Sequence, residues 1–218
     1  MSKRIKNPKE TQTKDLHQYL LGSVAPRPIA FVSTKDKDGN DNLAPYSFFN
    51  VFSANPPVVI FSPARRVRDN TIKHTLENVI EVPEVVINIV NYKMVQQMSL
   101  SSTEYPKGVN EFVKAGLTQL ASEEVKPPRV AAAPAALECV VVDTYTVQHR
   151  GGDHRYTMTF GEVVGIHIND DFIHDGRVDT AAMQLVTRMG YDEYAVLEKA
   201  FSLSRPDNDP LLSGFVKS

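Results

Sequence analysis

A basic segment in the first half of the chain holds residues whose types and spacing could bind an anion. Lys73, His74 and Thr75 lie at or near the start of an expected helix. The loop just before them holds three arginines: Arg65, Arg66 and Arg68. Free N–H groups at a helix start, the helix dipole and a nearby lysine can together bind a phosphate. A basic, polar first turn is equally typical of a solvated or capped helix end, so both interpretations stay open.

An aromatic run that contains polar residues is a second candidate site. Its members are Tyr46, Ser47, Phe48, Phe49, Asn50 and Phe52. The aromatic side chains could form a flat wall for a planar heterocycle, and Ser47 and Asn50 could hydrogen-bond to the edge of that ring. Packing in the core is the alternative for the same aromatic side chains.

The histidines and the single cysteine indicate no metal site. The six histidines are His17, His74, His149, His154, His167 and His174. A metal needs ligands that converge on one point, whereas His149 and His154 lie on opposite sides of a Gly–Gly turn and have no cysteine partner. Cys139 lies in an apolar run, which predicts a buried, inert thiol that cannot form an internal disulfide.

Length and composition narrow the classes of function. The chain has 218 residues, of which 42% are hydrophobic and 23% charged, as in an ordinary globular domain. Its 24 Lys and Arg against 26 Asp and Glu leave a net charge of -2, which speaks against nucleic acid or an anionic membrane as a partner. No apolar run is long enough for a membrane span and the start is polar, so we expect a cytoplasmic protein. Phosphate-loop and Gly-x-Gly-x-x-Gly motifs are absent from the sequence.

The elements that must position these residues are mainly strands. Runs rich in Val, Ile, Phe, Thr and Tyr predict strands at residues 28–34, 46–53, 57–62, 85–90, 137–150 and 156–168. Helical spacing predicts shorter helices at residues 70–82, 93–100 and 180–186, the last with Asp179 as N-cap. The turn at residues 37–40 predicts a hairpin. Tight turns between strands favour antiparallel pairing, so we expect a closed or sandwiched antiparallel sheet with peripheral helices.

Several blocks of the sequence are similar to one known family. The blocks are residues 26–34, 42–50, 55–57, 73–78, 86–88, 152–154, 161–163 and 188–194. Together they resemble the flavin reductase-like, FMN-binding split-barrel proteins, in particular the reductase components of two-component monooxygenases and the flavoredoxins. His74 stands where the family usually has an acid, and Tyr191 stands in place of a second glycine. We expect a flexible arm at 1–15, the family's domain at 16–206 and a tail at 207–218.

The resemblance implies a fold, a cofactor and a reaction. It implies a mainly β, antiparallel Greek-key split barrel, a homodimer, and FMN that takes a hydride from NADH or NADPH for a monooxygenase or another electron acceptor. By the same resemblance the cofactor-binding residues are Arg27, Tyr46, Ser47, Phe48, Phe49, Asn50, Arg65, Arg68, Lys73, Thr75 and Asn78. Of these, Tyr46 to Asn50 would line the isoalloxazine, and Lys73 and Thr75, with Arg65 or Arg68, would bind the phosphate. His154 would be the catalytic residue, on the nicotinamide side.

Two other functions remain open on the sequence. One is an FMN-containing electron-transfer protein without a nicotinamide site of its own. The other is a non-enzymatic binding module of the same barrel shape, which would hold another cofactor or none.

Overall fold

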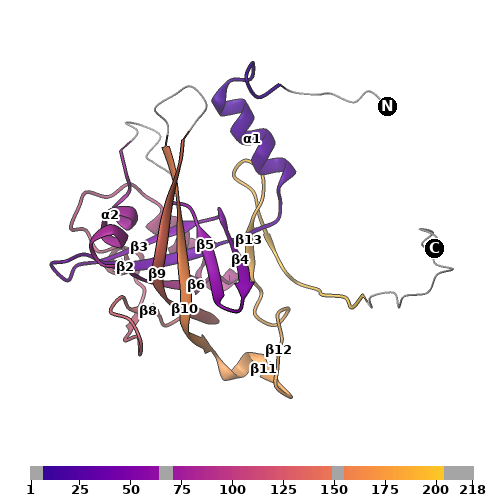
Figure 1. Cartoon of the computed structure of the whole chain (residues 1–218). Coiled ribbons are helices and arrows are strands. Elements are labelled where there is room, and N and C mark those ends of the chain that lie inside the picture. The colour runs from indigo at the N-terminus through magenta and orange to yellow at the C-terminus, as the bar shows by residue number, and fades with distance from the viewer. Residues whose placement is uncertain (1–6, 64–70, 149–154, 204–218) are drawn as a thin grey trace, which may run out of the picture.

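Strands dominate the structure, a computed structural model that describes residues 7–63, 71–148 and 155–203 (Figure 1). The helices are α1 (Thr13–Ser23), α2 (His74–Glu81), α3 (Val95–Ser101) and α4 (Glu111–Ala115), with 3-10 turns η1 (Tyr92–Met94) and η2 (Asp170–Phe172). The main strands are β2 (Ala30–Lys35), β3 (Asp41–Tyr46), β4 (Phe49–Ala54), β5 (Pro57–Phe61), β6 (Glu84–Ile89), β9 (Ala135–Gln148) and β10 (Arg155–Ile168). The short strands are β1 (Arg27–Pro28), β7 (Gln119–Leu120), β8 (Arg129–Val130), β11 (Ile173–His174), β12 (Arg177–Val178), β13 (Val186–Arg188) and β14 (Tyr194–Val196).

The large sheet has seven strands in the order β3-β2-β6-β9-β10-β5-β4, and its neighbouring strands are antiparallel. Its two edge strands, β3 and β4, are consecutive along the chain, and only Ser47 and Phe48 separate them. A two-residue link cannot span an open seven-stranded sheet, because neighbouring strands lie about 4.8 Å apart. The sheet therefore curls until its edges meet at this corner, which gives the antiparallel split barrel expected from the sequence.

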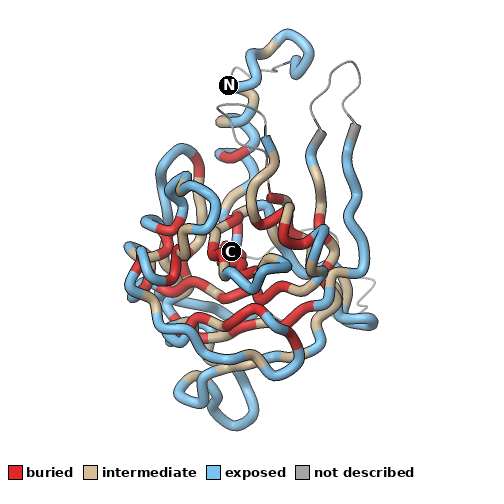
Figure 2. Tube along the Cα trace, turned by 90° about the vertical axis from the view of Figure 1, so that its left-hand side faces the viewer, coloured by how far each residue is buried: buried red, intermediate tan, exposed pale blue. Residues whose placement is uncertain are grey.

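Strand β2 is buried on both faces and lies between two cores. One core lies inside the barrel: Ala30, Val32, Tyr46, Val59, Phe61, Val79, Val85, Ile87 and Cys139. The other lies between the sheet and the helices α3 and α4: Ile29, Phe31, Leu43, Val90, Met94, Met98, Phe112, Val130 and Val186. Because successive side chains of a strand point to opposite faces, Ile29 and Phe31 fill the second core while Ala30 and Val32 fill the first. Figure 2 shows this burial along the strand layers.

The strands β9 and β10 form a ribbon that extends beyond the rest of the sheet. β10 pairs with β5 only over Thr159–Glu162, and β9 pairs with β6 only over Ala136–Val140. Beyond those positions the two strands pair with each other alone, and the far part of β9 is exposed (Figures 1 and 2). The ribbon leads to residues 149–154, so the predicted catalytic His154 lies outside the described residues.

The turn and most of the predicted elements are confirmed. At the 37–40 turn the Asp36 carboxylate accepts hydrogen bonds from the main-chain N–H groups of Asp38 and Asn40, and Gly39 has a φ of 88° that favours glycine. α2 begins at His74 and ends before Pro83, inside the predicted range 70–82.

The predicted helix at residues 180–186 is wrong. The segment forms a single turn, in which the Asp179 carboxylate accepts a hydrogen bond from the N–H of Ala182. Gln184 then takes a φ of 50°, which ends the turn, and the chain enters β13 at Val186. The apolar spacing reflects a buried Met183 and Val186 rather than one helical face.

Two helices are not foreseen from the sequence. α1 begins at Thr13, inside the range 1–15 expected to be an arm, and buries only Leu21 of its own residues. α4 is five residues long, is capped by the Asn110 side chain, and ends at Gly116 with a φ of 65°. Both are too short or too weakly apolar for the periodicity of the sequence to reveal them.

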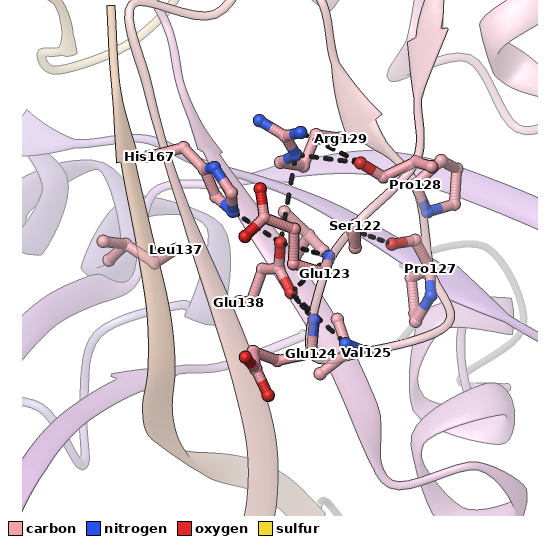
Figure 3. A network of polar contacts seen from close by, with 12 residues as sticks. Ser122, Glu123, Glu124, Val125, Pro127, Pro128, Arg129, Leu137, Glu138 and His167 are labelled. Carbon is pink, nitrogen blue, oxygen red and sulfur yellow. Dashed lines mark hydrogen bonds and ion pairs between the residues drawn. The ribbon is translucent and has the colours of Figure 1, made fainter.

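A buried carboxylate holds the segment before β8 against the ribbon (Figure 3). Glu138 of β9 is 0% exposed and accepts hydrogen bonds from the main-chain N–H groups of Glu123, Glu124 and Val125. The Nε2 atom of His167 lies 2.6 Å from its Oε1, and Nε of Arg129 lies 3.9 Å from the same oxygen. Burial alone would raise the pKa of Glu138, but the N–H donors and His167 outweigh it and hold the pKa below its usual value.

The buried thiol of Cys139 lies next to Glu138 along β9. Cys139 is fully buried, and burial together with the charge of Glu138 raises the pKa of its thiol to about 12, which fits the expected inert thiol. Within the described ranges, no three His, Cys, Asp or Glu side chains group as a metal would require. No helix among those residues is long and apolar enough to cross a membrane.

Candidate functional site

A cleft opens where β3, the start of α2 and the segment after α3 meet. Its lining residues are Asn42, Ala44, Pro45, Tyr46, Lys73, His74, Thr75, Ser101, Ser102, Thr103, Glu104, Tyr105 and Glu111. Three of the residues predicted to bind the cofactor are therefore brought together here: Tyr46, Lys73 and Thr75. The fold explains the meeting, because α2 packs on β2 and β3, the two strands of the first hairpin.

The hydroxyl of Thr75 lies at the centre of a buried polar network beneath the cleft. Its Oγ1 accepts a hydrogen bond from the Tyr46 hydroxyl at 2.8 Å and another from Nδ2 of Asn42 at 3.0 Å. A hydroxyl oxygen has two lone pairs and one hydrogen, so both acceptor positions of Thr75 are taken. The structure gives no acceptor for its hydrogen among the described residues, although the side chain is only 1% exposed. Thr75 is thus left as a donor at the wall of the cleft.

Positive charge lies beside this donor. Lys73 is the N-cap residue of α2, and its own side chain forms no capping hydrogen bond. Its Nζ lies 5.2 Å from the centroid of the Tyr46 ring, a cation–π distance that keeps the ammonium on the same wall as Thr75. A helix start, an ammonium and a hydroxyl donor are the groups that proteins use to bind a phosphate.

These residues have the chemistry to bind a phosphate group. The test is the buried hydroxyl of Thr75, since a buried polar group ordinarily finds a partner for each strong donor. A phosphate oxygen in the cleft would accept that hydrogen, and Lys73 would balance its charge. The Thr75 hydroxyl and the Lys73 ammonium are therefore a donor set that suits an anion, on a cleft wall whose lining also includes Glu104 and Glu111.

The other residues predicted to line the isoalloxazine, at positions 47–50, lie at the corner between β3 and β4. They are not part of the lining of this cleft. Phe48 is 41% exposed, with its ring 6.4 Å from that of His17 in an edge-on contact. Phe49 packs against the core inside the barrel, and Asn50 is exposed. Ser47 is partly buried between them. Their contact with an isoalloxazine remains a prediction, as does that of Tyr46, whose ring is itself buried in the core.

Arg27 and Asn78 have structural partners that explain their burial. The Arg27 guanidinium donates to the main-chain carbonyls of Leu21, Val24 and Met189, and so fastens the end of α1 to the segment after β13. Burial, and then the nearby Arg188, lower the pKa of Arg27. Asn78 donates from Nδ2 to the Thr34 hydroxyl at 3.0 Å. Neither residue lines the cleft, so their direct contact with a cofactor stays a prediction.

Three predicted site residues lie outside the described residues, and two residues at the cleft were not predicted from the sequence. Arg65, Arg68 and His154 all lie outside the described residues. Asn42 was not predicted to have a role, although it begins the block 42–50 that carries the family resemblance. Glu111 was also missed: its buried carboxyl accepts the N–H of Leu43 at 3.0 Å, and burial raises its pKa. No local pattern signals Glu111, because its partner is 68 residues away.

Known proteins resemble this chain along most of its length. The model of the family "Flavin reductase like domain" matches residues 21–182. Nitrilotriacetate monooxygenase component B of Bacillus cereus is 31% identical with a TM-score of 0.87, covering 93% of this chain and 100% of that one. A candidate flavin reductase of Shewanella frigidimarina with a split barrel domain is 25% identical with a TM-score of 0.77, covering 91% and 96%. An uncharacterised protein of Halalkalibacterium halodurans is 38% identical, covering 92% and 95%.

Proposed function

Since the chain belongs to the flavin reductase-like family, we propose that it is an NAD(P)H-dependent flavin reductase that binds FMN in the cleft between β3 and α2. The observation that carries the proposal is the buried Thr75 hydroxyl, whose oxygen accepts two hydrogen bonds and whose residue lines the cleft together with Lys73. When bound, FMN supplies a ring that accepts a hydride from a nicotinamide.

The protein's own part in the reaction is to bind and to orient. Thr75 donates a hydrogen bond to the phosphate, and Lys73 adds a charge-assisted contact. The corner residues Ser47 and Phe48 then line the ring at the point where the barrel edges meet. Holding donor and acceptor rings together lowers the entropic cost of hydride transfer, and no acid or base from the protein is needed for that step. His154 belongs to the nicotinamide side in this proposal.

A homodimer is part of the proposal. Exposed apolar side chains occur on β4, at Val51 and Phe52, and on the free part of the ribbon, at Tyr145, Val147 and Tyr156. In the register of the ribbon, Val147 lies opposite Tyr156 and Tyr145 lies opposite Met158, so these four side chains share one face. Apolar patches of this kind mark protein–protein contacts. The relative from Bacillus cereus is named as a monooxygenase component, which supports a monooxygenase, or another acceptor, as the recipient of electrons.

A visible absorption spectrum tests the cofactor, and nicotinamide addition tests the activity. The purified protein is incubated with FMN, desalted and scanned, and we expect it to retain the two flavin bands. NADH or NADPH added without air should then bleach those bands. If the flavin is retained but neither nucleotide bleaches it, the protein is an electron carrier rather than a reductase. If no flavin is retained and added FMN supports no oxidation of NADH or NADPH, the proposal is wrong.

A separate substitution tests the proposed role of His154. His154→Ala should slow the oxidation of the nicotinamide while FMN stays bound, because the residue lies on the nicotinamide side in this proposal. Steady-state rates with NADH and NADPH, compared with the FMN dissociation constant of the same variant, measure both effects. Unchanged rates with both nucleotides would remove His154 from the site.

A further inference from the structure

We infer that Tyr46 and Asn42 are positioning residues, which fix the Thr75 hydroxyl as a donor toward the phosphate of FMN. The inference rests on the proposed function and deepens it, because it assigns the phosphate affinity of the cleft to side chains that need not contact the phosphate. Tyr46 thereby has a different role from the one the sequence predicts, which was to line the isoalloxazine.

The Thr75 hydroxyl lies near the start of a helix. Such a hydroxyl rotates, and in helices it commonly donates back to a main-chain carbonyl three or four residues earlier. A Thr75 hydroxyl that did so would present only an oxygen lone pair to the cleft, which would repel a phosphate. Two donors aimed at the oxygen, one from Tyr46 and one from Asn42, occupy both lone pairs and leave the hydrogen to point elsewhere.

The Asn42 donor is itself held in place by a buried partner. Nδ2 of Asn42 also lies 3.5 Å from the Thr34 hydroxyl, which in turn accepts the Asn78 amide. Asn42 and Thr34 are directly paired across β3 and β2, so the backbone register fixes their separation. The whole network is buried, and it joins two strands to α2 before it ends at the cleft.

The ring of Tyr46 contacts other groups than its hydroxyl does. The ring packs 6.0 Å from that of Phe61 in the core, and Lys73 lies over it. Replacing Tyr46 by phenylalanine would therefore keep the packing and the cation–π contact and remove only the hydroxyl. The substitution therefore removes the contact that positions Thr75 and leaves the ring contact with Lys73 in place.

The test compares FMN with riboflavin, which has the same ring and ribityl chain but no phosphate. In Tyr46→Phe we expect the FMN dissociation constant to rise about three- to tenfold, as the loss of one positioned hydrogen bond allows, while that of riboflavin stays unchanged. In a Thr75→Val background, Tyr46→Phe should have no further effect on FMN, because it acts through Thr75. Asn42→Ala should lower the preference for FMN in the same way.

Controls distinguish a failure of this inference from a general effect of substitution and from a failure of the proposed function. Tyr92→Phe removes the same atom from an exposed tyrosine outside the cleft and should change neither affinity. If the unaltered protein binds FMN no more tightly than riboflavin, the phosphate site itself fails. If it prefers FMN but Tyr46→Phe keeps that preference, the inference fails while the proposed function stands. Equal losses for FMN and riboflavin would mean that Tyr46 contacts the ring, and would also overturn the inference.

Discussion

Two of the buried polar networks in the described part of the chain, one around Glu138 and one around Thr75, differ in what satisfies their hydrogen bonds. Around Glu138, each carboxylate oxygen accepts hydrogen bonds from groups of the chain itself, namely main-chain N–H groups and His167. Around Thr75, neutral hydroxyl and amide groups donate toward one oxygen, and a hydrogen is left over at a cleft. The first network is complete without a ligand, and the second is complete only with an acceptor.

The difference separates residues that hold the fold from residues that bind. A saturated buried carboxylate contributes to stability, because removing it would leave several N–H donors without a partner. A buried hydroxyl whose hydrogen has no acceptor costs stability, and a ligand that accepts this hydrogen removes the cost. We therefore expect substitutions at Glu138 to change unfolding and substitutions at Thr75 to change FMN affinity.

The largest effect is expected at Glu138. Glu138→Ala should lower the free energy of unfolding by about 3–5 kcal/mol, because the N–H groups of residues 123–125 lose their acceptor inside the protein. Thermal or urea unfolding measures the loss. Glu123→Gln is the matched control, since only the main-chain N–H of Glu123 takes part and its side chain is exposed. A loss below about 1 kcal/mol in Glu138→Ala would mean that water replaces the carboxylate and that the comparison fails.

The next effect is expected at Thr75. Thr75→Val keeps the shape of the side chain and removes the donor, so the FMN dissociation constant should rise tenfold or more, which is about 1.4 kcal/mol. Thr75→Ser restores a hydroxyl and should recover most of the affinity. Fluorescence titration with FMN measures both variants. If Thr75→Val binds FMN normally, the phosphate lies elsewhere and the leftover hydrogen has no role in binding.

The smallest effect is on the pH dependence of stability, where two buried glutamates should act with opposite signs. The pKa of Glu138 is lowered in the folded protein, so its contribution is present above the unfolded pKa of about 4.3 and is lost as the pH falls through the folded pKa. The pKa of Glu111 is raised by burial, so its contribution is present below about 4.3 and is lost as the pH rises through its folded pKa.

Unfolding temperatures measured across this range separate the two. Glu138→Gln should weaken the loss of stability in acid, and Glu111→Gln should weaken the loss just above pH ~4.3. Parallel curves for the unaltered protein and Glu138→Gln would contradict the assigned role of the carboxylate.

The sequence predicts most of the long strands and one wall of the cleft, but the single strand predicted at 46–53 is divided in the structure between the end of β3 and β4. It also misses the contacts that join distant segments. Periodicity and turn residues suffice for β5, β6, β9, β10 and α2, because each is a local pattern. Lys73 and Thr75 are found for the same reason, at a helix start. Asn42 and Glu111 were missed, because their roles come from partners 33 and 68 residues away, which no local pattern shows. The helix predicted at 180–186 is wrong since a positive φ at Gln184 overrides its spacing.

The most direct test of the phosphate site is a paired titration of the unaltered protein with FMN and with riboflavin under the same conditions. Because Lys73 and Thr75 contact only the phosphate in the proposed site, FMN should bind at least tenfold more tightly than riboflavin, a difference of about 1.4 kcal/mol. Equal affinities would contradict the central claim, since the cleft between β3 and α2 would then make no use of the donor that its buried network presents.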